Sequence, residues 1–202
     1  MSSTQEAAVI SQEAVRQLFT EARTHASWLP KKVEVHTLHA LFDLLKWGPT
    51  SANTQPARFL FIQSAQAKER LIPCLAPGNV EKTKAAPLTA IVALDEKFHE
   101  LLPRFFPHMP QMKDMMASNK TLAETTAFRN GTLQGGYFIL AARAVGLDCG
   151  PMSGFENAKV DETFFKGTTW KSNFLCNLGY GDATKLHPRN PRLTFDEACK
   201  II

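Results

Sequence analysis

Eight consecutive residues, from Pro49 to Pro56, carry polar side chains whose types and spacing suit the binding of a ligand. The segment reads Pro-Thr-Ser-Ala-Asn-Thr-Gln-Pro. The two terminal prolines restrict its backbone, and the small side chains let backbone amides approach a bound group. Ser51, Asn53 and Gln55 add hydrogen-bond donors and acceptors. Such a segment by itself also fits an ordinary capped turn, so the rest of the chain must decide between the two.

The loop lies between two strongly apolar segments. Before it, Leu38, Leu41, Phe42 and Leu45 recur at helical spacing. After it, residues 58–62 read Arg-Phe-Leu-Phe-Ile, which is typical of a buried strand. The loop therefore joins a predicted helix to a predicted strand.

The remaining elements follow from the same two periodicities. We predict helices over 6–20, 65–75, 121–145 and 158–165, a turn over 77–79, and strands over 88–94 and 172–180. The segment 121–145 has few polar residues in its second half, which predicts a central helix suited to a subunit interface.

Length and composition are those of an ordinary globular protein. The 202 residues are 44% hydrophobic and 21% charged, which predicts a single domain over 1–202. The net charge is +4 and the basic residues form no block, so we expect no nucleic-acid partner. No apolar run has the length of a membrane span, and the first residues lack a secretory pattern. We therefore expect no membrane partner and a cytoplasmic location.

Candidate metal ligands and disulfide partners are scattered along the chain. The four cysteines show no CxxC spacing, which predicts reduced thiols and no zinc site. They are Cys74, Cys149, Cys176 and Cys199. His36 and His39 lie three residues apart on a predicted helix without a recognisable third ligand, so we interpret them as surface residues and expect no metal. The glycines within 131–136 lack the setting of a phosphate loop, and close helix packing explains them.

Four separated motifs follow one another along the chain. They are Arg23-Thr24-His25, the loop Pro49 to Pro56, the spaced residues Ala142, Gly146, Leu147, Pro151 and Gly154, and the basic pair Arg189 and Arg192. In order and spacing they resemble the nitroreductase family of flavin-dependent oxidoreductases. The family's corresponding segments are Arg-x-Ser/Thr, Pro-Ser-Ser-x-Asn-x-Gln-Pro, Ala-x-x-x-Gly-Leu-x-x-x-Pro-x-x-Gly and a closing basic segment. The resemblance covers nearly the whole chain.

This resemblance implies an α+β, nitroreductase-like fold, with a mainly antiparallel central sheet surrounded by helices, and a homodimer. It also implies an FMN cofactor, NADPH or NADH as electron donor, and flavin chemistry that needs no catalytic side chain. Arginine forks suit the FMN phosphate, and hydroxyl and amide groups suit its other polar edges. The implied cofactor-binding residues are Arg23, Thr24, His25, Pro49, Ser51, Asn53, Gly154, Arg189 and Arg192.

Within the family, the chain resembles most the malonic semialdehyde reductases, or 3-hydroxypropionate dehydrogenases, of pyrimidine degradation. The segments that carry this likeness are 22–25 with Trp28, Arg58-Phe59 and 128–136. The implied reaction reduces a small aldehyde, malonic semialdehyde, to 3-hydroxypropionate by hydride transfer through the flavin. Two alternatives stay open: a nitro or quinone reductase with broad substrates, and a flavin-binding protein without turnover.

Two positions depart from the family pattern. Ser153 stands where many relatives carry Glu, and Ser27 stands where many carry a basic residue. A nearby cation stabilises a negatively charged reduced flavin. We interpret Arg189 as the candidate that takes the place of the missing cation.

A stretch rich in Phe, Met and Pro runs from Phe98 to Met116. It fits two interpretations equally: a loosely helical excursion over a satellite apolar cluster, or a cap over a pocket. Arg104 is the arginine of this stretch, and it could pair with a substrate carboxylate or pack its stem on a neighbouring Phe. Asn79 is a second substrate-binding candidate, by resemblance.

Overall fold

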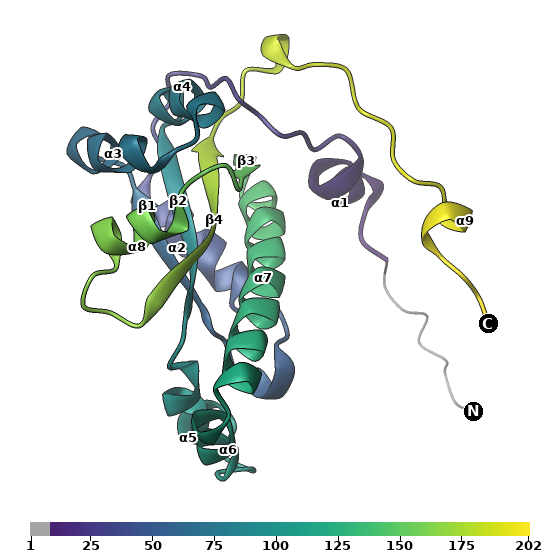
Figure 1. Ribbon diagram of the computed structural model, residues 1–202. Coiled ribbons are helices and arrows are strands. Elements are labelled where there is room, and N and C mark those ends of the chain that lie inside the picture. The colour runs from purple at the N-terminus through teal and green to yellow at the C-terminus, as the bar shows by residue number, and fades with distance from the viewer. Residues whose placement is uncertain (1–8) are drawn as a thin grey trace.

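The computed structural model describes residues 9–202 and places a four-stranded antiparallel sheet at its centre. The strands are β1 Ala57–Ile62, β2 Leu88–Asp95, β3 Asp148–Met152 and β4 Trp170–Gly179, in the spatial order β1-β2-β4-β3. Helices lie against both faces of this sheet (Figure 1). The predicted α+β fold with an antiparallel central sheet is confirmed.

The helices are distributed along the whole described chain. They are α1 Gln12–Val15, α2 Val35–Leu45, α3 Ala65–Leu71, α4 Pro77–Ala85, α5 Leu102–Phe105, α6 Met112–Ser118, α7 Lys120–Ala144, α8 Asn157–Phe164 and α9 Phe195–Ala198. Short turns of 3-10 helix cover Ser51–Asn53, Ile72–Cys74, Phe98–Leu101 and Ala183–Lys185, and a π-helical turn covers Arg16–Thr20.

Strand β2 is covered on both faces, and for that reason its sequence is apolar apart from Thr89, which hydrogen-bonds Asn177, and the terminal Asp95. Successive side chains of a strand point to opposite faces of the sheet. Ala90 and Val92 belong to the cluster formed with α2 and α7, whereas Ile91 and Ala93 belong to the cluster formed with α3 and α8. The strand predicted over 88–94 is confirmed.

Helix α7 packs very closely on the sheet, and glycines make this approach possible. A Cβ atom on Gly135 would lie 2.5 Å from the ring of Phe174, and one on Gly131 would lie 3.3 Å from Leu94 Cβ. Larger residues at either position would push the helix away from the sheet. The predicted central helix is confirmed, and so is the packing role of Gly131 and Gly135, whereas a Cβ atom on Gly136 would meet nothing within 4 Å.

The Phe98 to Met116 stretch packs over a satellite cluster at one end of the sheet, beside the N-terminal end of α7 (Figure 1). Phe98, Leu102 and Met116 are buried there together with Ala123 and Ala127 of α7. The first of the two interpretations of this stretch is confirmed.

Two local features were predicted wrongly, and a third was confirmed only in part. The supposed turn over 77–79 is the first turn of α4, where Pro77 is tolerated because the first helical N–H needs no intrahelical partner. The helix predicted over 6–20 consists, in its described part, of α1 and a π-helical turn without buried residues, while residues 6–8 lie outside the described residues. Strand β3 was not predicted, because Gly150 and Pro151 argue against a strand; it is an edge strand, where proline is accepted.

Two terminal segments extend away from the sheet on the α7 side (Figure 1). One contains α1, and the other is residues 181–202, called the C-terminal arm below. Leu193, Phe195 and Ile201 of this arm are exposed.

The cysteines are free thiols, as predicted, with Cys74, Cys149 and Cys176 buried and Cys199 exposed. A hydrogen bond with Cys149 and burial raise the pKa of Cys176, so this thiol stays protonated. Within residues 9–202 no cluster of three potential metal ligands occurs. No helix in this described part is both long and apolar enough to cross a membrane.

Candidate functional site

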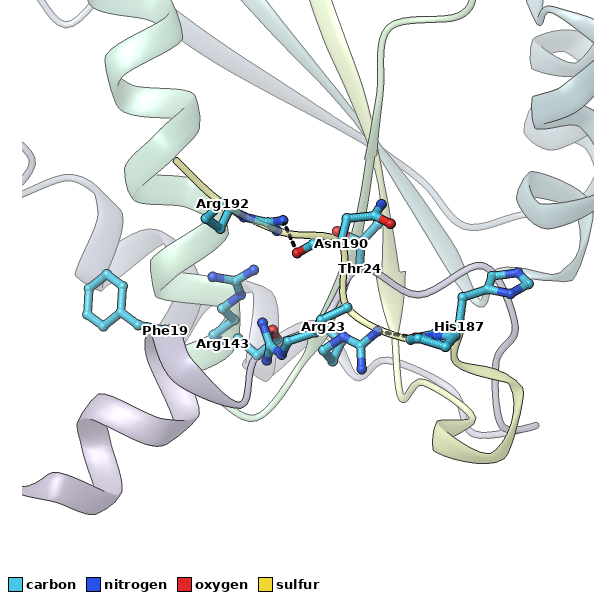
Figure 2. Close-up of a pocket in the computed structure, with 10 residues that line it drawn as sticks. Phe19, Arg23, Thr24, Arg143, His187, Asn190 and Arg192 are labelled. Atoms are coloured by element: carbon cyan, nitrogen blue, oxygen red, sulfur yellow. Dashed lines mark hydrogen bonds between the residues drawn. The ribbon is translucent and has the colours of Figure 1, made fainter. Parts of the chain in front are cut away.

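An arginine-lined cavity of about 530 Å³ lies where three distant parts of the chain meet. The segment after the π-helical turn, the C-terminal end of α7 and the C-terminal arm form its walls (Figure 2). The lining residues are Phe19, Ala22, Arg23, Thr24, Arg143, His187, Pro188, Arg189, Asn190 and Arg192.

Backbone carbonyls hold the guanidinium groups of this cavity in place. Arg23 donates to the His187 carbonyl, and Arg189 donates to the carbonyls of Thr20 and Ala22 at 2.6 and 3.0 Å. Arg23 therefore binds the arm, and Arg189 of the arm binds the N-terminal segment. This mutual pairing holds the two walls of the cavity together.

The other two arginines are held in the same way. Arg192 donates to the carbonyls of Asn190 and Pro191 at 2.9 and 3.1 Å, and Arg143 donates to the Leu18 carbonyl at 2.8 Å. A guanidinium carries five N–H donors, so each arginine keeps further donors for a ligand.

The cavity is built for an anion. It holds four guanidinium groups, and none of its described lining residues is acidic. Within residues 9–202 none of the four arginines forms an ion pair, and the buried Arg143 Nε has no hydrogen-bond partner there. A phosphate dianion would supply both the charge and the acceptors that these groups lack. The donor set therefore fits the phosphate of a bound nucleotide.

His25 does not line this cavity. Its side chain is buried, with Nε2 3.5 Å from Asp148 Oδ1, and its backbone N–H donates to the Cys149 carbonyl. Asp148 in turn accepts the N–H of Gly181 at 2.8 Å. Trp28 forms a bridge with the same glycine. His25 thus packs where the C-terminal arm leaves the sheet.

The Asp182 carboxylate caps the turn that follows on the arm. It accepts hydrogen bonds from the Thr184 hydroxyl and N–H at 2.6 and 3.0 Å. These bonds hold the pKa of Asp182 below its ordinary value. The Asp182 N–H donates to the Ser27 carbonyl, so Ser27 joins the arm through its backbone.

The Pro49 to Pro56 loop is backbone-strained. Ala52, Asn53 and Gln55 have φ angles of 47°, 50° and 41°, in the left-handed region that non-glycine residues avoid. Asn tolerates this region, but Ala52 and Gln55 there each cost on the order of 1–3 kcal/mol and persist where their surroundings enforce it. Strain of this kind is concentrated at binding and catalytic sites, which favours a binding loop over an ordinary turn.

Side chains and α5 hold the outer part of this loop. Asn53 Nδ2 donates to the Phe105 carbonyl at 2.9 Å, and Gln55 Nε2 donates to Asn53 Oδ1 at 2.9 Å. Ser51 and Pro49 are exposed. The loop therefore presents small polar groups to solvent next to the Phe98 to Met116 stretch.

Asn79 and Gly154 contact each other. Asn79 is buried, and its Nδ2 donates to the Gly154 carbonyl at 2.7 Å. A Cβ atom on Gly154 would lie 2.6 Å from the same nitrogen. Asn79 thus anchors the segment after β3, which explains why a glycine is required there.

Arg104 lies on the exposed side of α5, with its guanidinium carbon 4.8 Å from the centre of the Phe105 ring. The guanidinium itself, rather than the stem that one interpretation placed on a neighbouring Phe, lies over this ring. Because Asn53 donates to the Phe105 carbonyl, Arg104 is also one residue from the strained loop.

The structure thus brings together Arg23, Thr24, Arg189 and Arg192, and it adds Arg143, His187 and Asn190, which sequence reasoning missed. It does not bring the strained loop to them. The Ser51 N–H contacts Asn130 on α7, whereas the cavity contacts Arg143, 13 residues further along the same helix. At ~1.5 Å per residue the two points are ~20 Å apart along α7.

Comparisons by sequence and by structure both match this chain to nitroreductases. The model of a family described as "Nitroreductase family" matches residues 8–180. A candidate NADH dehydrogenase/NAD(P)H nitroreductase of Burkholderia lata is 58% identical over 192 residues, which cover 95% of this chain and 98% of the relative. A relative of the same description from Ralstonia nicotianae is 56% identical over 186 residues, covering 92% and 95%.

Solved structures show the same fold. A candidate nitroreductase from Bacillus subtilis superposes with a TM-score of 0.85 at 19% identity, covering 95% of this chain and all of that one. A candidate nitroreductase from Exiguobacterium sibiricum, solved in complex with FMN, gives a TM-score of 0.82 at 20% identity, covering 98% and 99%.

Proposed function

The chain belongs to the nitroreductase family, and on that premise we propose that it is an FMN-dependent NAD(P)H oxidoreductase that reduces malonic semialdehyde to 3-hydroxypropionate. The arginine-lined cavity is the observation that supports FMN as the cofactor. Its four guanidiniums, acid-free wall and unpartnered Arg143 Nε suit a phosphate dianion. The FMN complex of the structural neighbour and the NAD(P)H in the relatives' names support the same choice.

When bound, FMN takes up two electrons from a reduced nicotinamide and passes them to an organic substrate. The residues of this chain bind and orient the cofactor. Arg23, Arg189 and Arg192 would hold the phosphate, with Thr24 beside them. Ser51 and Asn53 of the strained loop would offer hydrogen bonds to the polar edge of the ring.

We propose that two chains complete each site. The separation of ~20 Å along α7 between the strained loop and the cavity means that one chain does not place both around the same part of a cofactor. A second chain can bring its own loop to the cofactor held in the cavity of the first. Exposed Trp47 and Phe42 near the loop and Phe128 and Leu133 of α7 supply apolar surface for such an interface.

The holoprotein is accordingly expected to sediment as a homodimer at micromolar concentration. The control is a Phe128→Asp variant, which places a charge on the exposed apolar side of α7 and should shift the species toward monomer with loss of FMN. A wild-type monomer that retains FMN and full activity would contradict the shared site.

Substrate choice is tested by kinetics of Arg104→Met with malonic semialdehyde and with an uncharged quinone. A substrate carboxylate needs a cation near the pocket, whereas a quinone does not. Arg104 adjoins the strained loop through Phe105. We expect kcat/KM to fall at least about tenfold, or roughly 1.4 kcal/mol, for malonic semialdehyde alone.

Lys97→Met is the matched control, because this exposed cation precedes the same stretch and pairs with Glu100. It should leave both substrates unaffected. Equal losses on both substrates in Arg104→Met, or none, would remove Arg104 from the substrate site. Turnover of quinones or nitro compounds without the aldehyde would favour the broad-substrate alternative, which the relatives' names support. Bound FMN without NAD(P)H oxidation would indicate the non-catalytic alternative.

A further inference from the structure

Two buried amide side chains of α7 face the strained loop. Asn130 is 5% exposed and Gln134 is 4% exposed. Residues four apart in a helix lie on the same face, one turn above the other. Two polar side chains on a buried helix face need hydrogen-bond partners, and the loop supplies them.

Each amide accepts a backbone N–H at one end of the loop region. Asn130 Oδ1 accepts the N–H of Ser51 at 2.8 Å, and Gln134 Oε1 accepts the N–H of Ala57 at 2.9 Å. Ser51 precedes the residues with positive φ, and Ala57 follows them and begins β1. The two amides therefore fix the loop region on either side of its strained part.

The orientation of the Asn130 amide is determined by its second hydrogen bond. Asn130 Nδ2 donates to the Thr126 carbonyl at 2.9 Å. Only one orientation of the amide satisfies both a donor on the loop and an acceptor on the helix. The Oδ1 acceptor is therefore held in the position where it meets the Ser51 N–H.

The close packing of α7 brings these amides within reach of the loop. Gly131 and Gly135 each follow one of the two amides and let the helix approach β2 and β4. The same two turns of helix thus combine small residues toward the sheet with amides toward the loop.

We propose that Asn130 and Gln134 are positioning residues that hold the loop in its left-handed conformation and so determine the affinity of the site for the flavin. This inference rests on the proposed function, because the flavin is the ligand that the loop would contact. Without the two acceptors, Ala52 and Gln55 would relax toward ordinary backbone angles. Ser51 and Asn53 would then no longer present their polar groups in the binding geometry.

The test is titration of apoprotein with FMN, with thermal unfolding and the visible circular dichroism of the bound flavin measured in parallel. Asn130→Ala is expected to raise the Kd for FMN at least about tenfold and to change the flavin dichroism. Asn130→Asp keeps an acceptor oxygen for the Ser51 N–H but loses the donor to the Thr126 carbonyl, so its Kd should lie between those of wild type and Asn130→Ala. Asn130→Ala with Ala52→Gly should recover affinity, because glycine adopts positive φ without strain.

Asn119→Ala is the matched control. Asn119 caps the start of α7 through the same kind of bond, accepting the Leu122 N–H at 3.0 Å, away from the loop. It should lower thermal stability but leave FMN affinity and dichroism unchanged. Gln134→Met, of similar volume, serves as the second variant if Asn130→Ala does not fold, and should raise the Kd at least about fivefold.

The outcomes distinguish an error in the proposed function from an error in the positioning role alone. If wild-type apoprotein does not bind FMN, the proposed function is wrong. If wild type binds but Asn130→Ala and Gln134→Met lose only stability, as Asn119→Ala does, the positioning role alone is wrong.

Discussion

Replacing Arg23 with alanine is expected to weaken FMN binding about ten- to a hundredfold, through loss of a charge-assisted contact worth about 1.5–3 kcal/mol. The structure gives this arginine two roles. It lines the cavity, and it donates to the His187 carbonyl on the C-terminal arm. Its removal would therefore delete a proposed phosphate ligand and loosen the wall that carries Arg189 and Arg192. Titration of the apoprotein with FMN measures the effect.

The matched control is Arg16→Ala. Arg16 is exposed, pairs with Glu21 at 3.7 Å and does not line the cavity, so the variant removes the same charge without removing a ligand. Its FMN affinity should equal that of wild type. Raised salt should narrow the difference between wild type and Arg23→Ala, because screening weakens the phosphate contact. Unchanged affinity in Arg23→Ala would remove the phosphate assignment from this cavity.

The sequence predicted the central elements because their packing leaves clear patterns. Strand β2 is covered on both faces, so its positions are apolar apart from Thr89 and the terminal Asp95. Helix α7 is long, and Phe174 and Leu94 explain its glycines Gly135 and Gly131. In both cases the surroundings and the local pattern agree, and periodicity alone identifies the element.

Where tertiary contacts override the local pattern, the prediction failed. Pro77 and Gly78 resemble a turn, yet the hydrogen bond from Asn79 to Gly154, 75 residues away, accompanies a helix there. Strand β3 contains Pro151, but pairing with β4 holds it at the edge of the sheet. The pairing partner is distant in sequence, so no local window contains the signal.

The candidate site was predicted in part, for a related reason. Arg23, Arg189 and Arg192 were found through motifs, but His187 and Asn190 lie in the arm without a local pattern of their own. Arg143 did carry a signal. It is the lone charged residue in the apolar run from 138 to 147. Burying a guanidinium in such a run is costly unless it meets an anion. Only the fold shows that these residues share one cavity.

Gly181→Ala is expected to lower both stability and FMN affinity, because this glycine leaves no space for a side chain. A Cβ atom there would lie 2.1 Å from Nδ1 of the buried His25 ring. Either the ring or the C-terminal arm must move, and overpacking of this kind costs about 1–3 kcal/mol. For a chain of this size each kcal/mol corresponds to about 2–4 °C in Tm.

The loss should reach the cavity because the arm that carries Arg189 and Arg192 begins at Gly181, where Asp148 accepts its N–H. Gly78→Ala is the matched control: Gly78 lies in α4 with nothing within 4 Å of an added Cβ. Alanine is the better helix former by roughly 0.5–1 kcal/mol, so this variant should be as stable as wild type or more so. Calorimetry and FMN titration on both variants decide the matter. A Gly181→Ala protein with wild-type Tm would show that the C-terminal arm can move away from His25 without loss of stability. The contact between His25 and Gly181 would then not hold the cavity wall.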